Sequence, residues 1–202
     1  MDDVYVAMFV MQNDDFVVIV SGIPRSGTSV MMHMLAAGGI PALTDRRRQP
    51  DVDNPSGYFE IDAVKGLARD PTFLDEARGK AVKVIHAMLS HLPLDRAYRV
   101  IFMQRNLDEV LASQRTMLDR GGQSGAALTE TQLKTIYASQ VQQVLRWLAA
   151  QANHVRVLEV DYGELVFDPR ATARAVNVFL GSVLNEDAMT AVVKPSLHRN
   201  KR

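Results

Sequence analysis

A glycine-rich turn between an apolar run and a helix-like segment limits the possible folds of this chain more than any other feature. The turn covers residues 22–29 and has the sequence GIPRSGTS. Residues 16–20 before it (FVVIV) are typical of a strand buried on both faces, and residues 30–37 after it are typical of a helix that ends at two glycines. Glycines let a backbone approach a phosphate closely, and the N–H groups and dipole at a helix start attract the anion. The segment therefore predicts a phosphate-binding cradle.

The spacing of this turn is close to the G-x-x-x-x-G-K-[ST] loop of nucleotide hydrolases. Gly22 and Gly27 have the separation of that motif, and Ser29 fills its last position. Thr28, however, stands where the motif has the lysine that reaches the β- and γ-phosphates. Arg25 supplies a cation inside the loop instead. ATP or GTP chemistry is therefore disfavoured, and a kinase or nucleotide hydrolase is the weaker alternative.

Length and charge place the chain among ordinary globular proteins. Its 202 residues suit one α/β domain over residues 1–202, and 47% of them are hydrophobic. The 23 basic and 23 acidic residues cancel, so no overall charge favours a nucleic-acid or membrane partner. The absence of cysteine excludes disulfides and thiolate metal sites. We expect a cytoplasmic protein without a transmembrane helix.

Four apolar runs of strand length alternate with helical patterns along the chain. They cover residues 16–20, 81–85, 99–103 and 155–160. Such alternation is typical of βαβ units, in which helices cover both faces of a parallel sheet. We predict a P-loop-type α/β domain with a central parallel sheet of about five strands flanked by helices. The fifth strand is expected from the N-terminal run or from residues 40–43.

Two helices have recognisable ends. A capping box at residues 129–132 precedes an apolar stripe at residues 133–148, which we expect to face the core. Asp168 followed by Pro169 is typical of a helix start, and Gly181 is typical of the position just after a helix.

An arginine and a serine lie near the start of the helix that follows the third apolar run. Arg105 comes just after residues 99–103, and Ser113 lies within a helix that we expect to begin at Asn106 or Asp108 and to end near Leu118. Their separation is slightly more than two helical turns, so the two side chains can share a face. Together they offer the donors that bind one phosphate. Taken alone, the pair is more typical of a helix-start arginine and a surface serine.

These motifs together resemble the sulfotransferases that use 3′-phosphoadenosine 5′-phosphosulfate (PAPS). The sequence PRSGT at residues 24–28 is similar to the family's 5′-phosphosulfate loop, and Arg105 with Ser113 is similar to its 3′-phosphate pair. A third similarity is DYGEL at residues 161–165, followed by a helix that ends in FLG at residues 179–181. The arginine in the loop is closer to the bacterial and tyrosylprotein enzymes than to the animal cytosolic ones, which usually have lysine there.

The resemblance implies an enzyme that moves a sulfuryl group from PAPS to a hydroxyl or amine of a small-molecule acceptor, without a metal. Arg25 is expected to neutralise the leaving group. The expected nucleotide-binding residues are Pro24, Arg25, Ser26, Gly27, Thr28, Ser29, Arg105, Ser113, Tyr162 and Arg199. Arg199 is included because the Arg-x-Gly segment of the cytosolic enzymes is absent and the basic tail at residues 194–202 could replace it; a solvated tail is the alternative. A non-catalytic nucleotide-binding protein of the same fold is the second interpretation of the whole chain.

The general base that deprotonates the acceptor has three candidates. Glu60 follows a turn and two aromatic residues that could carry a carboxylate over the loop, although it could equally cap a helix near Asp62. His86 follows the second apolar run near Lys83, one residue further along than in the Lys-x-His of the cytosolic enzymes. Asp45 lies at a distance beyond the loop comparable to that of the glutamate in the tyrosylprotein enzymes. We expect loops 41–58 and 120–129 to border the acceptor pocket.

Overall fold

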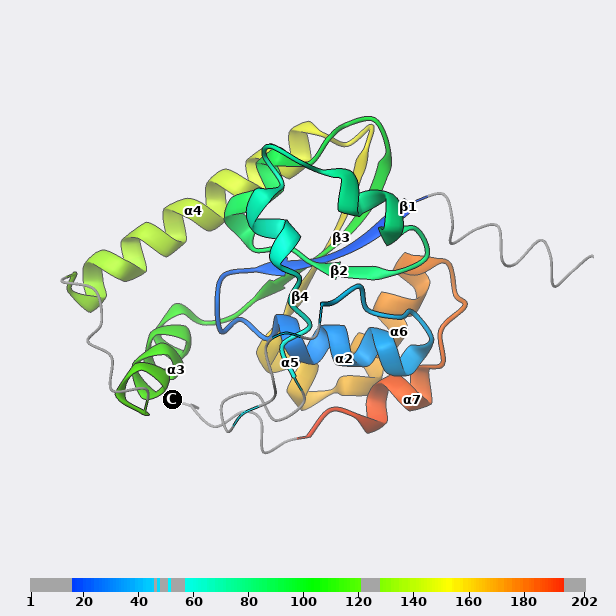
Figure 1. Ribbon diagram of the computed structural model, residues 1–202. Coiled ribbons are helices and arrows are strands. Elements are labelled where there is room, and N and C mark those ends of the chain that lie inside the picture. Colours follow the sequence, from blue (N-terminus) through cyan, green and yellow to red (C-terminus); the bar gives the residue numbers. More distant parts are fainter. Residues whose placement is uncertain (1–15, 46, 48–50, 52–56, 121–127, 195–202) are drawn as a thin grey trace, which may run out of the picture.

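A four-stranded parallel sheet forms the centre of the computed structural model, which describes all residues except 1–15, 46, 48–50, 52–56, 121–127 and 195–202 (Figure 1). The strands are β1 (Phe16–Gly22), β2 (Ala81–Lys83), β3 (Ala97–Gln104) and β4 (Val155–Asp161), in the order β2-β1-β3-β4. Each neighbouring pair is parallel. The predicted α/β class and the four predicted strands are confirmed. All four strands end at the same edge of the sheet, where ligands of such sheets bind.

The described part of the chain contains four strands, where about five were predicted. In the segment 40–43, only Ala42 pairs with β2, through an isolated bridge to Ala81. Pro41 accepts a hydrogen bond from the N–H of Ala81 but has no N–H to extend the ladder. The N-terminal run lies outside the described residues. The second strand is also shorter than predicted, because the chain turns into a 3₁₀ helix at His86.

The two faces of the sheet are covered by different sets of helices (Figure 1). One face carries α2 (Thr28–Gly38), α5 (Tyr162–Phe167), α6 (Pro169–Leu180) and α7 (Glu186–Ala191). The other carries α4 (Glu130–Ala150) and the short 3₁₀ helices η1 (Asp62–Gly66), η2 (Thr72–Ala77) and η3 (His86–His91). Alternate residues of β1 enter two separate cores: Val18 and Val20 on the α2 side, Val17 and Ile19 on the α4 side. Burial on both faces explains why β1 is continuously apolar.

The predicted helix ends are confirmed. The side chain of Thr129 accepts a hydrogen bond from the N–H of Gln132, and the Gln132 side chain accepts one from the N–H of Thr129, completing a capping box before α4. Asp168 caps α6 and Gly181 ends it with φ 106°. Between β3 and α4 lies α3 (Leu107–Arg120), which carries Ser113. Of the helices described, none combines the length and apolar composition that crossing a bilayer needs.

The prediction that the apolar stripe of α4 faces the core is correct only toward the end of the helix. Leu148 is buried, whereas Val141, Val144 and Leu145 are half-buried and Ile136 is 38% exposed. The first half of α4 extends beyond the sheet, so its apolar side chains have little core to enter (Figure 1). The apolar stripe is therefore longer than the part of α4 that packs against the core.

Candidate active site

The loop between β1 and α2 leads into the start of a helix at the C-terminal edge of the sheet. Gly27 precedes α2 with φ 100°, and no side chain caps the helix there. The first N–H groups of a helix lack an intrahelical partner, so the start of α2 and its dipole favour an anion. Arg25 adopts φ 69°, a left-handed conformation that costs a non-glycine residue about 1–2 kcal/mol. A strained, uncapped loop of this kind is typical of an anion-binding site.

Both glycines of the loop are required by close packing. A Cβ on Gly22 would lie 2.4 Å from the Oγ of Ser26 and 2.6 Å from the carbonyl oxygen of Met103 on β3. A Cβ on Gly27 would lie 2.3 Å from the Tyr162 ring. The loop is thus held between the end of β3 and the first residue of α5, which fixes its backbone.

Arg105 is buried at the exit of β3 with one donor unused. Its side chain is only 7% exposed. Its Nε donates a hydrogen bond of 3.0 Å to the Glu109 carboxylate, and its Nη1 donates one of 3.1 Å to the carbonyl oxygen of Arg25. The guanidinium carbon lies 4.4 Å from the centre of the Tyr162 ring. The Nη2 is buried and has no hydrogen-bond partner among the described residues. Because an unsatisfied buried donor is costly, this nitrogen points to an anion as its partner.

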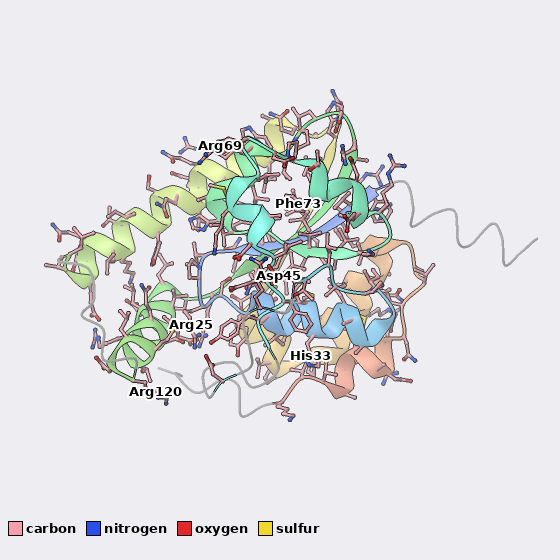
Figure 2. The ribbon with its side chains drawn as sticks, in the orientation of Figure 1. Arg25, His33, Asp45, Arg69, Phe73 and Arg120 are labelled. Atoms are coloured by element: carbon pink, nitrogen blue, oxygen red, sulfur yellow. The ribbon has the colours of Figure 1, made fainter. Side chains whose placement is uncertain are left out.

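The side chain of Arg25 turns toward α3 (Figure 2). Its Nε donates to the Oγ of Ser113 at 2.9 Å, and its Nη1 lies 3.9 Å from the sulfur of Met117. The sequence placed Arg25 with the loop and Ser113 with Arg105, as two separate motifs. The structure brings Arg25, Arg105, Ser113 and Tyr162 into one cluster, which we call the arginine cluster.

On the other side of the loop, Lys83 connects β2 to the start of α2. Its Nζ donates to the Oγ of Ser29 at 3.2 Å and to the carbonyl oxygen of Tyr58 at 3.0 Å, and lies 3.4 Å from a carboxylate oxygen of Glu60. Its side chain is 11% exposed, while that of Glu60 is 45% exposed. Sequence reasoning assigned Lys83 no role. Its position at the end of the strand next to β1 was the available signal, because parallel strands end together at the ligand-binding edge.

Glu60 is the candidate base that the structure brings to the loop. It follows Phe59, which adopts φ 53°, and the strain there is of the kind found at functional sites. The Phe59 ring packs edge-on against His33 of α2 at 5.6 Å between centroids. Glu60 is thus placed beside Lys83 by a strained residue anchored on α2.

His86 and Asp45 are held by other contacts. The Nε2 of His86 lies 3.0 Å from the Oε1 of Gln140 on α4, and its ring is buried. The Asp45 carboxylate accepts hydrogen bonds from the backbone N–H groups of Arg47 and Asp62, which lower the pKa of Asp45 below its ordinary value of 3.8. Asp45 therefore accepts a hydrogen bond at the start of η1, near which Glu60 was the alternative candidate for a helix cap. The lowered pKa of Asp45 also makes its carboxylate a weaker base.

The remaining expected residues divide into two groups. Ser26 is buried, and its Oγ has no hydrogen-bond partner within the described parts of the chain. Pro24 is exposed beside it. Arg199, half of the loop 41–58 and most of the loop 120–129 lie outside the described residues. Within those that are described, no cluster of three or more His, Asp or Glu side chains could hold a metal ion.

Comparison with known proteins agrees with this geometry. The family model "Sulfotransferase domain" matches residues 15–202. Among solved structures, the sulfotransferase domain of the Synechococcus PCC 7002 olefin synthase is similar over 94% of this chain and 84% of that one, with 19% identity and a TM-score of 0.50. Sulfotransferase STF1 of Mycobacterium tuberculosis H37Rv is similar over 93% of this chain and 73% of that one, with 16% identity and a TM-score of 0.52. At these identities the two structures show a shared fold. No curated protein matches the chain significantly.

The family match covers nearly the whole chain, and the predicted resemblance is thereby confirmed. The chain belongs to the sulfotransferase domain family and is an enzyme that transfers a sulfuryl group from PAPS.

Proposed function

We propose that the loop at residues 22–29, Lys83 and the arginine cluster together bind PAPS and transfer its sulfuryl group to a hydroxyl or amine of a small-molecule acceptor. The observation that carries this proposal is the buried Nη2 of Arg105, which lacks a partner among the described residues, in a cluster with Arg25 and Ser113. Such a donor set fits a dianionic phosphate, because arginine donates two hydrogen bonds in one plane. The cluster is assigned to the 3′-phosphate.

The 5′-phosphosulfate is assigned to the loop. No side chain caps the start of α2, and the buried Ser26 Oγ has no hydrogen-bond partner among the described residues. Tyr162 closes one side of the loop by packing against Gly27. The residues present therefore fit a phosphosulfate group. They do not offer the lysine at position 28 that nucleotide triphosphate hydrolysis uses.

The reaction forms one bond to sulfur and breaks another. The acceptor oxygen attacks the sulfur, the bond between sulfur and the bridging oxygen of the 5′-phosphate breaks, and its electron pair leaves on that oxygen. Negative charge develops on the leaving oxygen in the transition state, so a cation beside that oxygen lowers the activation barrier most. Lys83 is assigned to stabilise the charge on the leaving oxygen, because its Nζ lies 3.2 Å from the Oγ of Ser29 at the start of α2. Arg25 offsets the negative charge of the same leaving nucleotide at its 3′-phosphate.

Glu60 is assigned as the general base that takes the acceptor proton. Its carboxylate lies beside Lys83 and is open to solvent, so an acceptor can reach it. His86 is the second candidate, since its buried Nδ1 has no partner among the described residues. Asp45 is less suited because backbone hydrogen bonds already occupy it.

The deciding experiment compares nucleotides by their effect on thermal unfolding. Adenosine 3′,5′-bisphosphate (PAP) should raise the melting temperature of the protein, and ATP with magnesium should do so much less. Radiolabelled PAPS should then lose its sulfuryl group only when an acceptor is present. PAP binding without transfer to any acceptor would favour the alternative, a non-catalytic nucleotide-binding protein of this fold. A stronger response to ATP than to PAP would contradict the assignment of the arginine cluster.

A further inference from the structure

We propose that Glu109 is a positioning residue, which holds the Arg105 guanidinium so that its Nη2 is left for the 3′-phosphate of the nucleotide. Glu109 thereby lets the protein distinguish nucleotides that carry this phosphate from those that lack it. The observation behind the inference is the hydrogen bond of 3.0 Å from the Nε of Arg105 to the Oε2 of Glu109. The inference rests on the proposed function, because it concerns how the arginine cluster recognises PAPS.

The Arg105–Glu109 ion pair is buried where β3 leads into α3. Glu109 lies in the first turn of α3, and the two side chains are 7% and 16% exposed. A buried ion pair is weak evidence for stability, because the cost of removing two charges from water offsets much of their attraction. The geometry of the pair is therefore the better guide to its role.

Three contacts restrain the guanidinium of Arg105. Glu109 accepts a hydrogen bond from Nε, and the carbonyl oxygen of Arg25 accepts one from Nη1. The Tyr162 ring lies 4.4 Å from the guanidinium carbon. Because the N–H donors of arginine form a rigid planar fork, fixing Nε and Nη1 also fixes the direction of Nη2. Nη2 is the nitrogen that is buried without a hydrogen-bond partner among the described residues.

One face of α3 orders both arginines of the cluster. Glu109 and Ser113 are four residues apart on this helix, so their side chains lie on the same face. Glu109 holds Arg105, and Ser113 accepts the hydrogen bond from the Nε of Arg25. This face therefore sets the two guanidinium groups relative to each other and to the hydroxyl that is assigned to the same phosphate. Without Glu109, Arg105 would lose its connection to α3.

The charge and the geometry of Glu109 act in opposite directions on phosphate binding. A carboxylate near a phosphate repels it, so the charge of Glu109 weakens binding. A carboxylate that directs Nη2 toward the phosphate strengthens binding. Substitutions separate the two effects: glutamine keeps an oxygen acceptor at the same side-chain length without the charge, whereas aspartate keeps the charge but is one methylene shorter.

The experiment measures selectivity for the 3′-phosphate in Glu109→Gln and Glu109→Asp. Selectivity is the ratio of the dissociation constants of adenosine 5′-monophosphate and PAP, both from calorimetric titration. Glu109→Gln should keep the selectivity of the parent protein or exceed it. Glu109→Asp should lose about tenfold, corresponding to about 1.4 kcal/mol, mainly through weaker PAP binding. Its KM for PAPS should rise while kcat changes little, as expected when binding is lost equally in the ground state and the transition state.

The matched control is Asp108→Ala. This variant also removes a carboxylate from the first turn of α3, but Asp108 pairs with Lys134 at 2.8 Å and not with Arg105. Its selectivity should equal that of the parent protein. A loss in Asp108→Ala as large as that in Glu109→Asp would overturn the inference, because it would show a general effect of the helix start. Glu109→Ala is unsuitable as the main variant, since it leaves a buried guanidinium without its counterion.

A double substitution tests whether Glu109 acts through Arg105. In the Arg105→Ala background, adding Glu109→Asp should not change the selectivity further. An additional loss would contradict the inference, because Glu109 would then affect the phosphate by another route. Retained selectivity in Glu109→Asp together with its loss in Glu109→Gln would also overturn the inference, since the charge would then matter more than the reach of the side chain.

The inference and the proposed function fail in different ways. If the parent protein prefers PAP and Glu109→Asp is as selective as the parent, the proposed function stands and Glu109 has no positioning role. If the parent protein does not bind PAP, or binds it no more tightly than adenosine 5′-monophosphate, the assignment of the arginine cluster is wrong and the inference is overturned with it.

Discussion

The Nε of Arg25 donates a hydrogen bond of 2.9 Å to the Oγ of Ser113, 88 positions further along the chain. The carbonyl oxygen of Arg25 accepts a second hydrogen bond from Arg105. The loop before α2 and the exit of β3 are therefore joined through one residue. We expect substitutions in this cluster to affect nucleotide binding and turnover together.

Replacing Arg25 by alanine should lower kcat by about 10²–10³-fold, the usual loss when one well-placed electrostatic donor is removed. PAP should also bind more weakly, because the side chain lies at Ser113. Steady-state kinetics and calorimetric titration with PAP measure the two effects. Arg146→Ala is the control, since that side chain is exposed and its contacts stay within α4. A folded Arg25→Ala variant with normal kcat would remove Arg25 from the mechanism.

Replacing Arg105 by alanine should weaken PAP binding by about 1.5–3 kcal/mol, the range for hydrogen bonds to a charged group. Adenosine 5′-monophosphate, which lacks the 3′-phosphate, should lose much less affinity. The difference between the two ligands isolates the contact, since general damage to the site would weaken both. Equal losses in a titration of the two ligands would show that Arg105 does not bind the 3′-phosphate.

Replacing Glu60 by glutamine should abolish most turnover while PAP still binds, because glutamine cannot accept the acceptor proton. The pH–rate profile should also lose its acidic limb, which reports protonation of the base. His86→Asn and Asp45→Asn are the comparison variants, each checked for PAP binding. If His86→Asn alone loses the limb, then His86 is the base and Glu60 only positions Lys83.

Two glycine substitutions separate backbone strain from steric clash. Gly27→Ala places a Cβ 2.3 Å from Tyr162 at φ 100°, whereas Gly39→Ala has a similar φ of 111° and no atom within 4 Å. Gly39→Ala should therefore lose only the cost of a left-handed alanine, about 1–2 kcal/mol of unfolding free energy. Gly27→Ala should lose more and should also bind PAP poorly. Denaturant unfolding with and without PAP measures both; equal stability losses would contradict the packing against Tyr162.

Asp45 should stabilise the fold in a pH-dependent way. Its pKa is lowered by the hydrogen bonds from the backbone N–H groups of Arg47 and Asp62, so its stabilising contribution is present above the unfolded-state value. That contribution is lost as the pH falls through the lowered folded-state value. The melting temperature of Asp45→Asn should thus be below that of the parent at neutral pH, and the gap should close in acid. A gap that does not depend on pH would contradict this assignment.

The candidate site was only partly predictable. The glycine loop, Arg105 and Ser113 were identified because each belongs to a short local motif with its own chemistry. Lys83 was not, because its significance depends on a hydrogen bond to Ser29, which is 54 positions away. Asp45 and Glu60 were both candidate bases, and only their partners separate them: two backbone N–H groups for Asp45 and Lys83 for Glu60.

The sequence by itself determined the four strands of the sheet, the longer helices and their order along the chain. Continuous apolar runs predict buried strands. The capping box of α4 and the Asp168-Pro169 start of α6 act within a few residues, and the PRSGT loop has the local backbone pattern that is typical of a phosphate-binding turn. Only the tertiary structure decided that Arg25 meets Ser113, that Lys83 meets Ser29, and that Val141 and Leu145 of the α4 stripe border a cavity as well as the core. The physical reason is that caps and turns depend on neighbours in the chain. The direction of a long side chain and the burial of a helix face depend on which distant segments pack against them.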